Sequence, residues 1–153
     1  MKKRTFSPAL TPFKRSRLKS RIQGVLEVKK SSIKKAGKGV FACKDIPRGF
    51  QIPYIGKVYD PDVEFDDYTY TLLAEDGRSI DGNPSYNRSP YNVAFRVNDP
   101  PKGNRPNCKF EVSKGWTVIF SPMSIQTNRN ISAGEELFVD YGPGYVRSWN
   151  KKK

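Results

Sequence analysis

The stretch GEELFVDYGPGY, residues 134–145, places an Asp-Tyr pair after a strand-like run and directly before a Gly-Pro-Gly turn. Proline fixes its own φ and glycine tolerates unusual backbone angles, so such a turn can be sharp and stiff without regular structure. Tyr141 is therefore either a core residue at a strand end or a phenol that rigid backbone holds over a reaction centre. The rest of the sequence has to decide between these interpretations.

The composition excludes several kinds of site. The 153 residues include no histidine and two cysteines, Cys43 and Cys108, and their length suits one domain with a single core. Without histidine there is no Ser-His-Asp triad and no histidine-liganded metal, and two cysteines predict no structural zinc. No run of about 18 apolar residues occurs, so we expect no membrane-spanning helix and no membrane partner.

The net charge of +13 is concentrated near the N-terminus. Residues 1–38 contain 13 of the 28 Lys and Arg and a single acid, Glu27. We therefore expect a disordered basic arm over residues 1–21, a domain over residues 22–150 and a basic tail over residues 151–153. Such an arm can bind nucleic acid or direct a protein to the nucleus, although a solvated tail that only keeps the protein soluble remains open.

Short alternating runs and frequent Pro and Gly predict a mostly-β domain, because helical periodicity is almost absent. The expected elements are a strand within residues 25–32, a loop, strand and turn over 36–49, a short strand pair around Gly56 within 51–59, a hairpin over 68–81 that turns at Asp76 and Gly77, and a second hairpin over 108–120 that turns at Lys114 and Gly115.

Five blocks of sequence resemble, in the family's order, the SET domain, the fold of protein lysine methyltransferases that use S-adenosylmethionine. They are GKGVFACKDIPRG (37–49), PYIGKV (53–58), YTYTL with SID (68–72 and 79–81), VNDPPKGNRPNC (97–108) and ISAGEELFVDYG (131–142). The resemblance implies a β-clip-like fold of several short sheets with a pseudo-knot. Because a cysteine-rich zinc tail is absent, the chain is most similar to small, single-domain viral members.

The resemblance also assigns site residues. It implies a catalytic role for Tyr141, whose hydroxyl would steer the transferring methyl group together with backbone carbonyls. The implied cofactor-binding residues are Gly37, Lys38, Gly39, Tyr68, Asn98, Asp99, Tyr145 and Trp149, and the implied substrate-lysine channel is lined by Tyr54, Phe110 and Val139. Asp99 stands where the family usually has histidine, and three extra residues separate Asn98 from Asn107. Taken singly, each of these residues could equally belong to the core.

Methyl transfer to an amine suits a protein without histidine. The reaction is an in-line displacement, so the catalyst mainly positions the partners and excludes water. A free lysine, with a pKa of about 10.4, must lose its proton before it attacks. An aromatic channel favours the neutral amine by desolvation and places ring faces near the cationic product.

We expect a lysine methyltransferase that acts on a histone tail or another basic protein, in the nucleus (of a host cell, if the protein is viral), as a monomer or homodimer. The acidic stretch would complement such a substrate, or it is only a solvated loop; it contains Asp60, Asp62, Glu64, Asp66 and Asp67. In the family, two channel positions commonly set the product state, and the resemblance places Phe110 and Val139 there. Because neither side chain forms hydrogen bonds, the resemblance implies a di- or trimethyl product, unless both are ordinary strand residues and Tyr54 alone limits the product. The alternative is a catalytically weak SET-fold protein that binds nucleic acid or chromatin.

Overall fold

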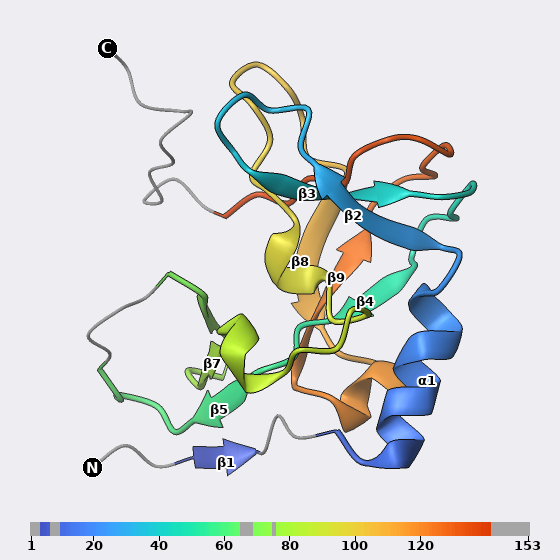
Figure 1. The fold of residues 1–153 in the computed structure, drawn as a ribbon. Helices are drawn as coiled ribbons and strands as arrows, with labels where there is room; N and C mark the ends of the chain where they lie inside the picture. The colour runs from blue at the N-terminus through green and yellow to red at the C-terminus, as the bar shows by residue number, and fades with distance from the viewer. Residues whose placement is uncertain (1–3, 7–9, 65–68, 75, 142–153) are drawn as a thin grey trace.

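The computed structural model describes residues 4–6, 10–64, 69–74 and 76–141 (Figure 1). In chain order the elements are β1 (Arg4–Phe6), α1 (Pro12–Ile22), β2 (Leu26–Lys30), β3 (Lys38–Ala42), β4 (Gln51–Pro53), β5 (Lys57–Tyr59), β6 (Thr71–Leu73), β7 (Ser79–Asp81), the 3-10 helices η1 (Pro84–Tyr86) and η2 (Ala94–Arg96), β8 (Cys108–Val112), the 3-10 helix η3 (Gly115–Ile119) and β9 (Met123–Thr127).

The described strands form three small antiparallel sheets, which confirms the mostly-β prediction. Their strand orders are β1-β5-β7-β6, β2-β3 and β4-β9-β8. The predicted hairpin at Asp76 and Gly77 is present as β6 and β7. Gly77 has a φ of +89°, a conformation that favours glycine, and the Asp76 carboxylate accepts from the backbone N–H of Arg78 at 3.0 Å.

Two predicted strand pairings are wrong. β4 and β5 flank Gly56 but lie in different sheets, because β4 pairs with β9 and β5 with β7. Gly56 passes so close to the next strand that an added Cβ would lie 2.3 Å from the carbonyl oxygen of Asp81. In the second expected hairpin the residues after Lys114 form η3, and the partner of β8 is β9.

The predicted disorder over residues 1–21 is wrong for Arg4–Phe6, which form β1 beside β5, and for residues 12–21, which belong to helix α1. The Thr11 hydroxyl caps the helix by accepting from the N–H of Lys14 at 3.2 Å. Leu18 and Ile22, one turn apart, are each 1% exposed and pack into the core. Burial of these two side chains fixes a helix that its many cations would otherwise leave in solvent.

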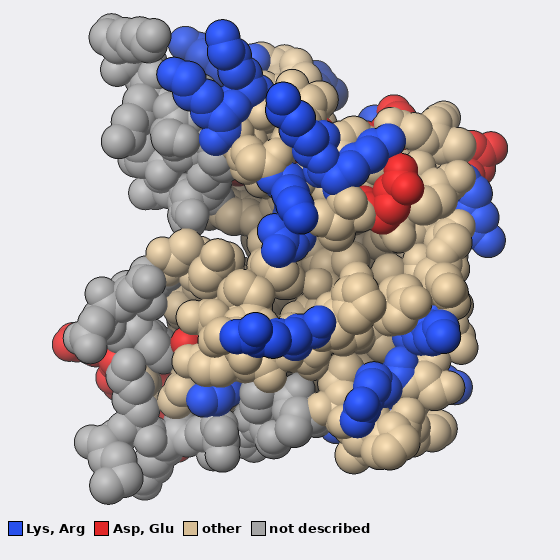
Figure 2. Space-filling view, viewed as in Figure 1, with Lys and Arg blue, Asp and Glu red and all other residues tan. Residues whose placement is uncertain are grey.

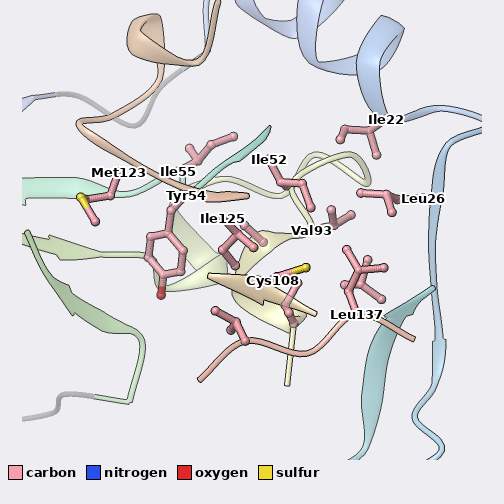
Figure 3. Packing of buried hydrophobic residues seen from close by; sticks show 14 of the residues in the cluster. Ile22, Leu26, Ile52, Tyr54, Ile55, Val93, Cys108, Met123, Ile125 and Leu137 are labelled. Carbon is pink, nitrogen blue, oxygen red and sulfur yellow. The ribbon is translucent and has the colours of Figure 1, made fainter. Parts of the chain in front are cut away.

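One hydrophobic cluster joins the helix, the sheets and the segment after β9. Figure 3 shows Ile22 of α1, Ile52 of β4, Ile125 of β9 and Leu137 in this cluster. The last of these belongs to residues 136–141, which we call the closing segment. Because Leu137 is buried in the cluster, it attaches the closing segment, which ends at Tyr141, to the core.

The closing segment lies between two parts of the chain that precede it. The N–H of Val139 donates to the carbonyl of Asn98 at 2.9 Å, and on the other side the N–H of Cys108 donates to the carbonyl of Phe138 at 2.9 Å. The side chain of Asn107 bonds the backbone of Glu136 and of Phe138, at 2.9 and 2.7 Å. This arrangement is the expected pseudo-knot. The extra residues after Asn98 do not obstruct it, since residues 102–105 are exposed.

Candidate functional site

Tyr141 is held at both its backbone and its hydroxyl. The hydroxyl donates to the carbonyl oxygen of Val97, and the backbone N–H donates to the carboxylate of Asp99 at 2.9 Å. Asp99, which replaces the family's usual histidine, thus anchors the residue predicted to be catalytic. Its predicted contact with the cofactor stays a prediction. The phenol of Tyr141 is thus held by the backbone carbonyl of Val97, while a role of the Gly-Pro-Gly turn in holding it stays a prediction.

Three aromatic rings, which we call the aromatic cluster, meet at this point. The ring of Phe110 lies 5.8 Å from that of Tyr141 and 6.2 Å from that of Tyr54, between ring centroids. The Tyr54 hydroxyl donates to the carbonyl of Tyr70 at 2.6 Å. Burial raises the pKa of Tyr54 far above its usual range, and the neighbouring Tyr141 adds to this shift, so the phenol stays neutral. The structure therefore unites two predicted channel residues with the predicted catalytic residue.

Val139, the third predicted channel residue, is fully buried in the hydrophobic core. Its backbone bridges to Cys108 on one side and bonds Asn98 on the other. It precedes Tyr141 by two residues in the closing segment. Whether Val139 lines a lysine channel stays a prediction.

The GxG segment, residues 37–39, lies beside Asn98, while binding of the cofactor by these residues stays a prediction. The side-chain amide of Asn98 donates to the carbonyl of Lys38 at 3.0 Å. Gly37 has a φ of +74°, and no atom lies within 4 Å of the place where a Cβ would be, so its surroundings are open. Gly39 is different: a Cβ there would lie 2.2 Å from a carboxylate oxygen of Glu136.

Glu136 is a buried residue that the sequence analysis did not single out. Its carboxylate accepts from the Ser31 hydroxyl at 2.7 Å and from the N–H and hydroxyl of Ser32 at 2.8 and 2.6 Å. A longer contact, 3.4 Å, comes from the amide of Asn98. Glu136 thus ties the loop before the GxG segment to the closing segment. The only local signal was a second glutamate within an apolar run.

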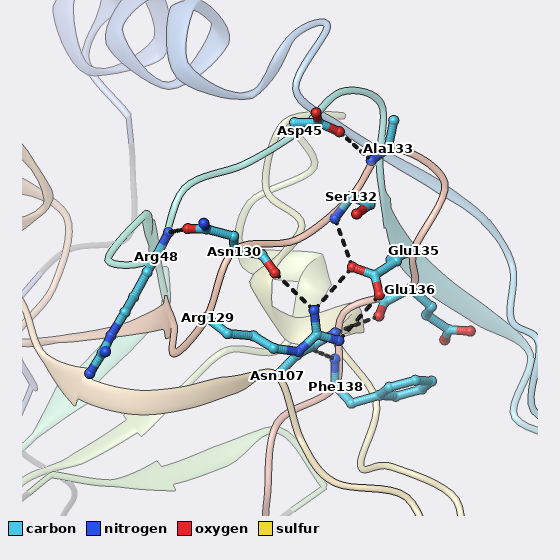
Figure 4. Close-up of polar contacts among 10 residues, drawn as sticks. All are labelled: Asp45, Arg48, Asn107, Arg129, Asn130, Ser132, Ala133, Glu135, Glu136 and Phe138. Atoms are coloured by element: carbon cyan, nitrogen blue, oxygen red, sulfur yellow. Dashed lines mark hydrogen bonds and ion pairs between the residues drawn. The ribbon is translucent and has the colours of Figure 1, made fainter.

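The turn before the closing segment is fixed by a second set of polar contacts (Figure 4). Glu135 accepts from Arg129 at 3.2 Å and from the N–H of Ser132 at 2.7 Å, and Asp45 accepts from the N–H of Ala133 at 3.0 Å. The hydrogen bond from Arg129 lowers the pKa of Glu135 below its usual value. These contacts attach the turn to the loop after β3.

The residues beside the GxG segment have a chemistry that suits the methionine part of S-adenosylmethionine. A pocket of about 560 Å³ adjoins the GxG segment and is lined by Lys30, Ile33, Lys35, Gly37 and Lys38. Open glycine backbone permits close approach of a ligand, and the lysines suit a carboxylate such as that of the methionine part. Tyr68, Tyr145 and Trp149, and the turn after Tyr141, lie outside the described residues.

Two further expectations concern absences. Within the described ranges, no three or more His, Cys, Asp and Glu side chains are grouped to hold a metal ion. None of the helices described is both long and apolar enough to span a bilayer.

Comparison with known proteins identifies the family. The SET domain family model matches residues 37–142. Histone-lysine N-methyltransferase EZH2 of Chaetomium thermophilum is 31% identical over 76% of this chain, which spans 8% of that protein's length. The methyltransferase domain of human PR domain-containing protein 2 shares the fold, with a TM-score of 0.56, 21% identity and 87% of each chain covered. Because the family model covers more than half of its residues, this chain belongs to the SET-domain family.

Proposed function

We propose that this protein transfers methyl groups from S-adenosylmethionine to a lysine side chain of a basic protein, such as a histone tail, to a di- or trimethyl product. One observation carries the proposal. The closing segment brings Tyr141 against the rings of Phe110 and Tyr54 on one side, while Asn98 and Asp99 link it to the GxG segment on the other.

S-adenosylmethionine, when bound, supplies an electrophilic methyl group on a positively charged sulfur. In this chain Gly37, Lys38 and Gly39 would hold it through backbone groups, and Asn98 and Asp99 would flank it. The Lys38 and Lys35 ammonium groups near the pocket would attract its carboxylate. The carbonyl of Val97, which already accepts from Tyr141, fixes the direction of that hydroxyl before any ligand arrives.

The aromatic cluster would select the neutral amine. An amine between its rings would lose part of its hydration, and the charged ammonium form would lose more hydration free energy there than the neutral form. The Tyr54 hydroxyl is already committed to the carbonyl of Tyr70, and its raised pKa keeps the phenol uncharged. Tyr54 therefore supplies no phenolate that would stabilise an ammonium ion, which favours deprotonation of the lysine before attack.

Charge supports a basic substrate. Asp60 is half-buried, and Asp62 and Glu64 are exposed in the segment that follows β5; Asp66 and Asp67 lie outside the described residues. Opposite charges raise the association rate of a cationic peptide more than its final affinity. The name of the EZH2 relative supports a histone-lysine substrate, although this chain corresponds to a small part of that protein.

Methylation of a peptide array by the full chain, with S-adenosylmethionine as donor, tests the function. Tyr141→Phe should lower turnover about a hundredfold or more while cofactor binding by calorimetry changes little, because the hydroxyl acts mainly in the transition state. Tyr91→Phe, which also removes one phenolic hydroxyl, is the matched control and should keep its turnover. Wild-type turnover in Tyr141→Phe would refute the assigned role. A wild-type chain that bound no S-adenosylmethionine would favour the alternative of a binding protein.

A further inference from the structure

A second pocket, of about 810 Å³, lies between residues 10–19, most of which belong to α1, and residues 86–91, from the end of η1 onward. We call it the basic pocket, and it is lined by Leu10, Pro12, Arg15, Ser16, Lys19, Tyr86, Asn87, Arg88, Ser89, Pro90 and Tyr91. It contains no residue of the GxG segment, the aromatic cluster or the closing segment. Pockets of about 300–1,000 Å³ are the usual size for ligands of nucleotide dimensions.

The charge of the basic pocket is of one sign. Arg15, Lys19 and Arg88 line it, and no Asp or Glu does. Arg15 and Lys19 are four residues apart and share a helix face, whereas Leu18 turns into the core. Helix α1 has no acidic residue, and Figure 2 shows Lys and Arg but no Asp or Glu over it. Among the described residues, none of the three cations forms an ion pair, so their charge is available to an anion.

The interior of the basic pocket is apolar and aromatic, and its loop is already formed. Pro12, Pro90 and the rings of Tyr86 and Tyr91 contribute to its lining. The side chain of Asn92 donates to the carbonyl of Asn87 at 3.1 Å, and the Asn87 side chain accepts from the N–H of Ser89, also at 3.1 Å. A preformed pocket loses little conformational entropy when a ligand binds.

Cations around an aromatic pocket are the combination that binds single-stranded nucleic acid, with phosphates on the cations and a base on a ring. We propose that the basic pocket binds one nucleotide of a single strand, with its base against Tyr91 and the flanking phosphates on Arg15, Lys19 and Arg88. A duplex keeps its bases stacked inside and cannot insert one into a pocket without unstacking it. This inference is independent of methyl transfer and assigns α1 a ligand in addition to its place in the core.

Fluorescence anisotropy of a labelled oligothymidine with the full chain, without S-adenosylmethionine, tests the proposal. We compare Lys19→Gln/Arg88→Gln with the control Lys44→Gln/Arg48→Gln, which removes the same charge from two exposed residues outside the basic pocket. The pocket variant should bind about tenfold more weakly. Its slope of log affinity against log salt should also fall by about 1.4, the value for two lost phosphate contacts on a single strand. The control should stay within about threefold of wild type.

Tyr91→Leu separates base stacking from charge, because leucine keeps apolar packing and removes the ring. It should weaken binding of the oligonucleotide at least about fivefold and leave heparin binding unchanged. Unchanged thermal melting of each variant shows that the fold is intact. Equal losses in the pocket and control variants would overturn the proposal, as would tighter binding of a duplex, heparin or a phosphoserine peptide than of the single strand.

Discussion

Gly39→Ala tests whether the buried carboxylate of Glu136 organises the cofactor side of the site. The φ of Gly39 is not in the left-handed region, so alanine meets no backbone strain there. Its Cβ, however, would lie 2.2 Å from one carboxylate oxygen of Glu136 and 2.9 Å from the carboxyl carbon. Because no such contact is tolerated, the carboxylate must move away.

The expected loss of stability follows from the hydrogen bonds that this carboxylate oxygen of Glu136 accepts. Its short bond, 2.7 Å, comes from the Ser31 hydroxyl, and its long one, 3.4 Å, from Asn98. A hydrogen bond to a charged group contributes about 1.5–3 kcal/mol, and the lower entropy of unfolded alanine returns about 0.4–1 kcal/mol. We therefore expect Gly39→Ala to lower the free energy of unfolding by about 1.5 kcal/mol. S-adenosylmethionine should bind at least about tenfold more weakly, since the loop before the GxG segment loses its anchor.

Urea denaturation followed by circular dichroism measures the stability of Gly39→Ala, and calorimetry measures its affinity for the cofactor.

A double variant tests whether the clash with Glu136 causes the loss of stability. Glu136→Asp shortens the side chain by one methylene and so moves the carboxylate away from residue 39. The double variant Gly39→Ala/Glu136→Asp should therefore be about 1 kcal/mol more stable than the sum of the two single effects predicts. Gly24→Ala is the control, because no atom lies within 4 Å of its Cβ position and its effect should add to that of Glu136→Asp. A Gly39→Ala protein within about 0.5 kcal/mol of wild type, with an additive cycle, would refute the reasoning.

Three other predictions concern the aromatic cluster, helix α1 and the two cysteines. Phe110→Tyr adds a hydroxyl to the aromatic cluster and should shift the product toward monomethyl-lysine by mass spectrometry of a saturated reaction; a wild-type product stalled at one methyl group would contradict the channel interpretation. Leu18→Ala removes a buried side chain and should lower the free energy of unfolding, measured in urea, by about 2–4 kcal/mol. Arg17→Ala changes an exposed residue of the same helix and is the control; equal effects of the two variants would show that α1 is not packed against the core. Burial raises the pKa of the Cys108 thiol to about 12, whereas Cys43 is exposed. At pH 8 a disulfide reagent should therefore label Cys43 alone as long as the protein stays folded. Rapid labelling of both thiols in the folded protein would show that Cys108 is not buried.

The local sequence predicted individual strands well because alternation and turn residues act over a few positions. It could not predict which strands pair, since β4 finds its partner β9 more than seventy residues later, at Ile52 and Ile125. The same limit explains the helix. In Pro12–Ile22 the buried face consists of Leu18 and Ile22, while the exposed cations dominate the composition. The density of charge predicted a solvated arm, but packing of Leu18 and Ile22 into the core stabilises a helix there.

Site residues within a family motif could be predicted from the sequence. Site residues whose contacts lie far away in the sequence could not. The resemblance placed Tyr141, Phe110 and Tyr54, which the structure brings together. Glu136 escaped notice because a glutamate in an extended run ordinarily faces solvent. Its partners Ser31 and Ser32 are 105 and 104 residues away in the sequence, so nothing near Glu136 reveals that it is buried and satisfied.

The position of the closing segment also sets the order in which this protein can become active during its synthesis. Residues 136–141 follow every described strand in the sequence, and the ribosome therefore releases them after those strands. A nascent chain can pair β2 with β3 or β8 with β9 as soon as both strands have emerged. The β-bridges of Asn98 to Phe138 and of Cys108 to Val139 can form only after the closing segment has emerged and lies between these two residues. The site around Tyr141 therefore cannot form before the closing segment has been synthesised, however early the sheets are complete.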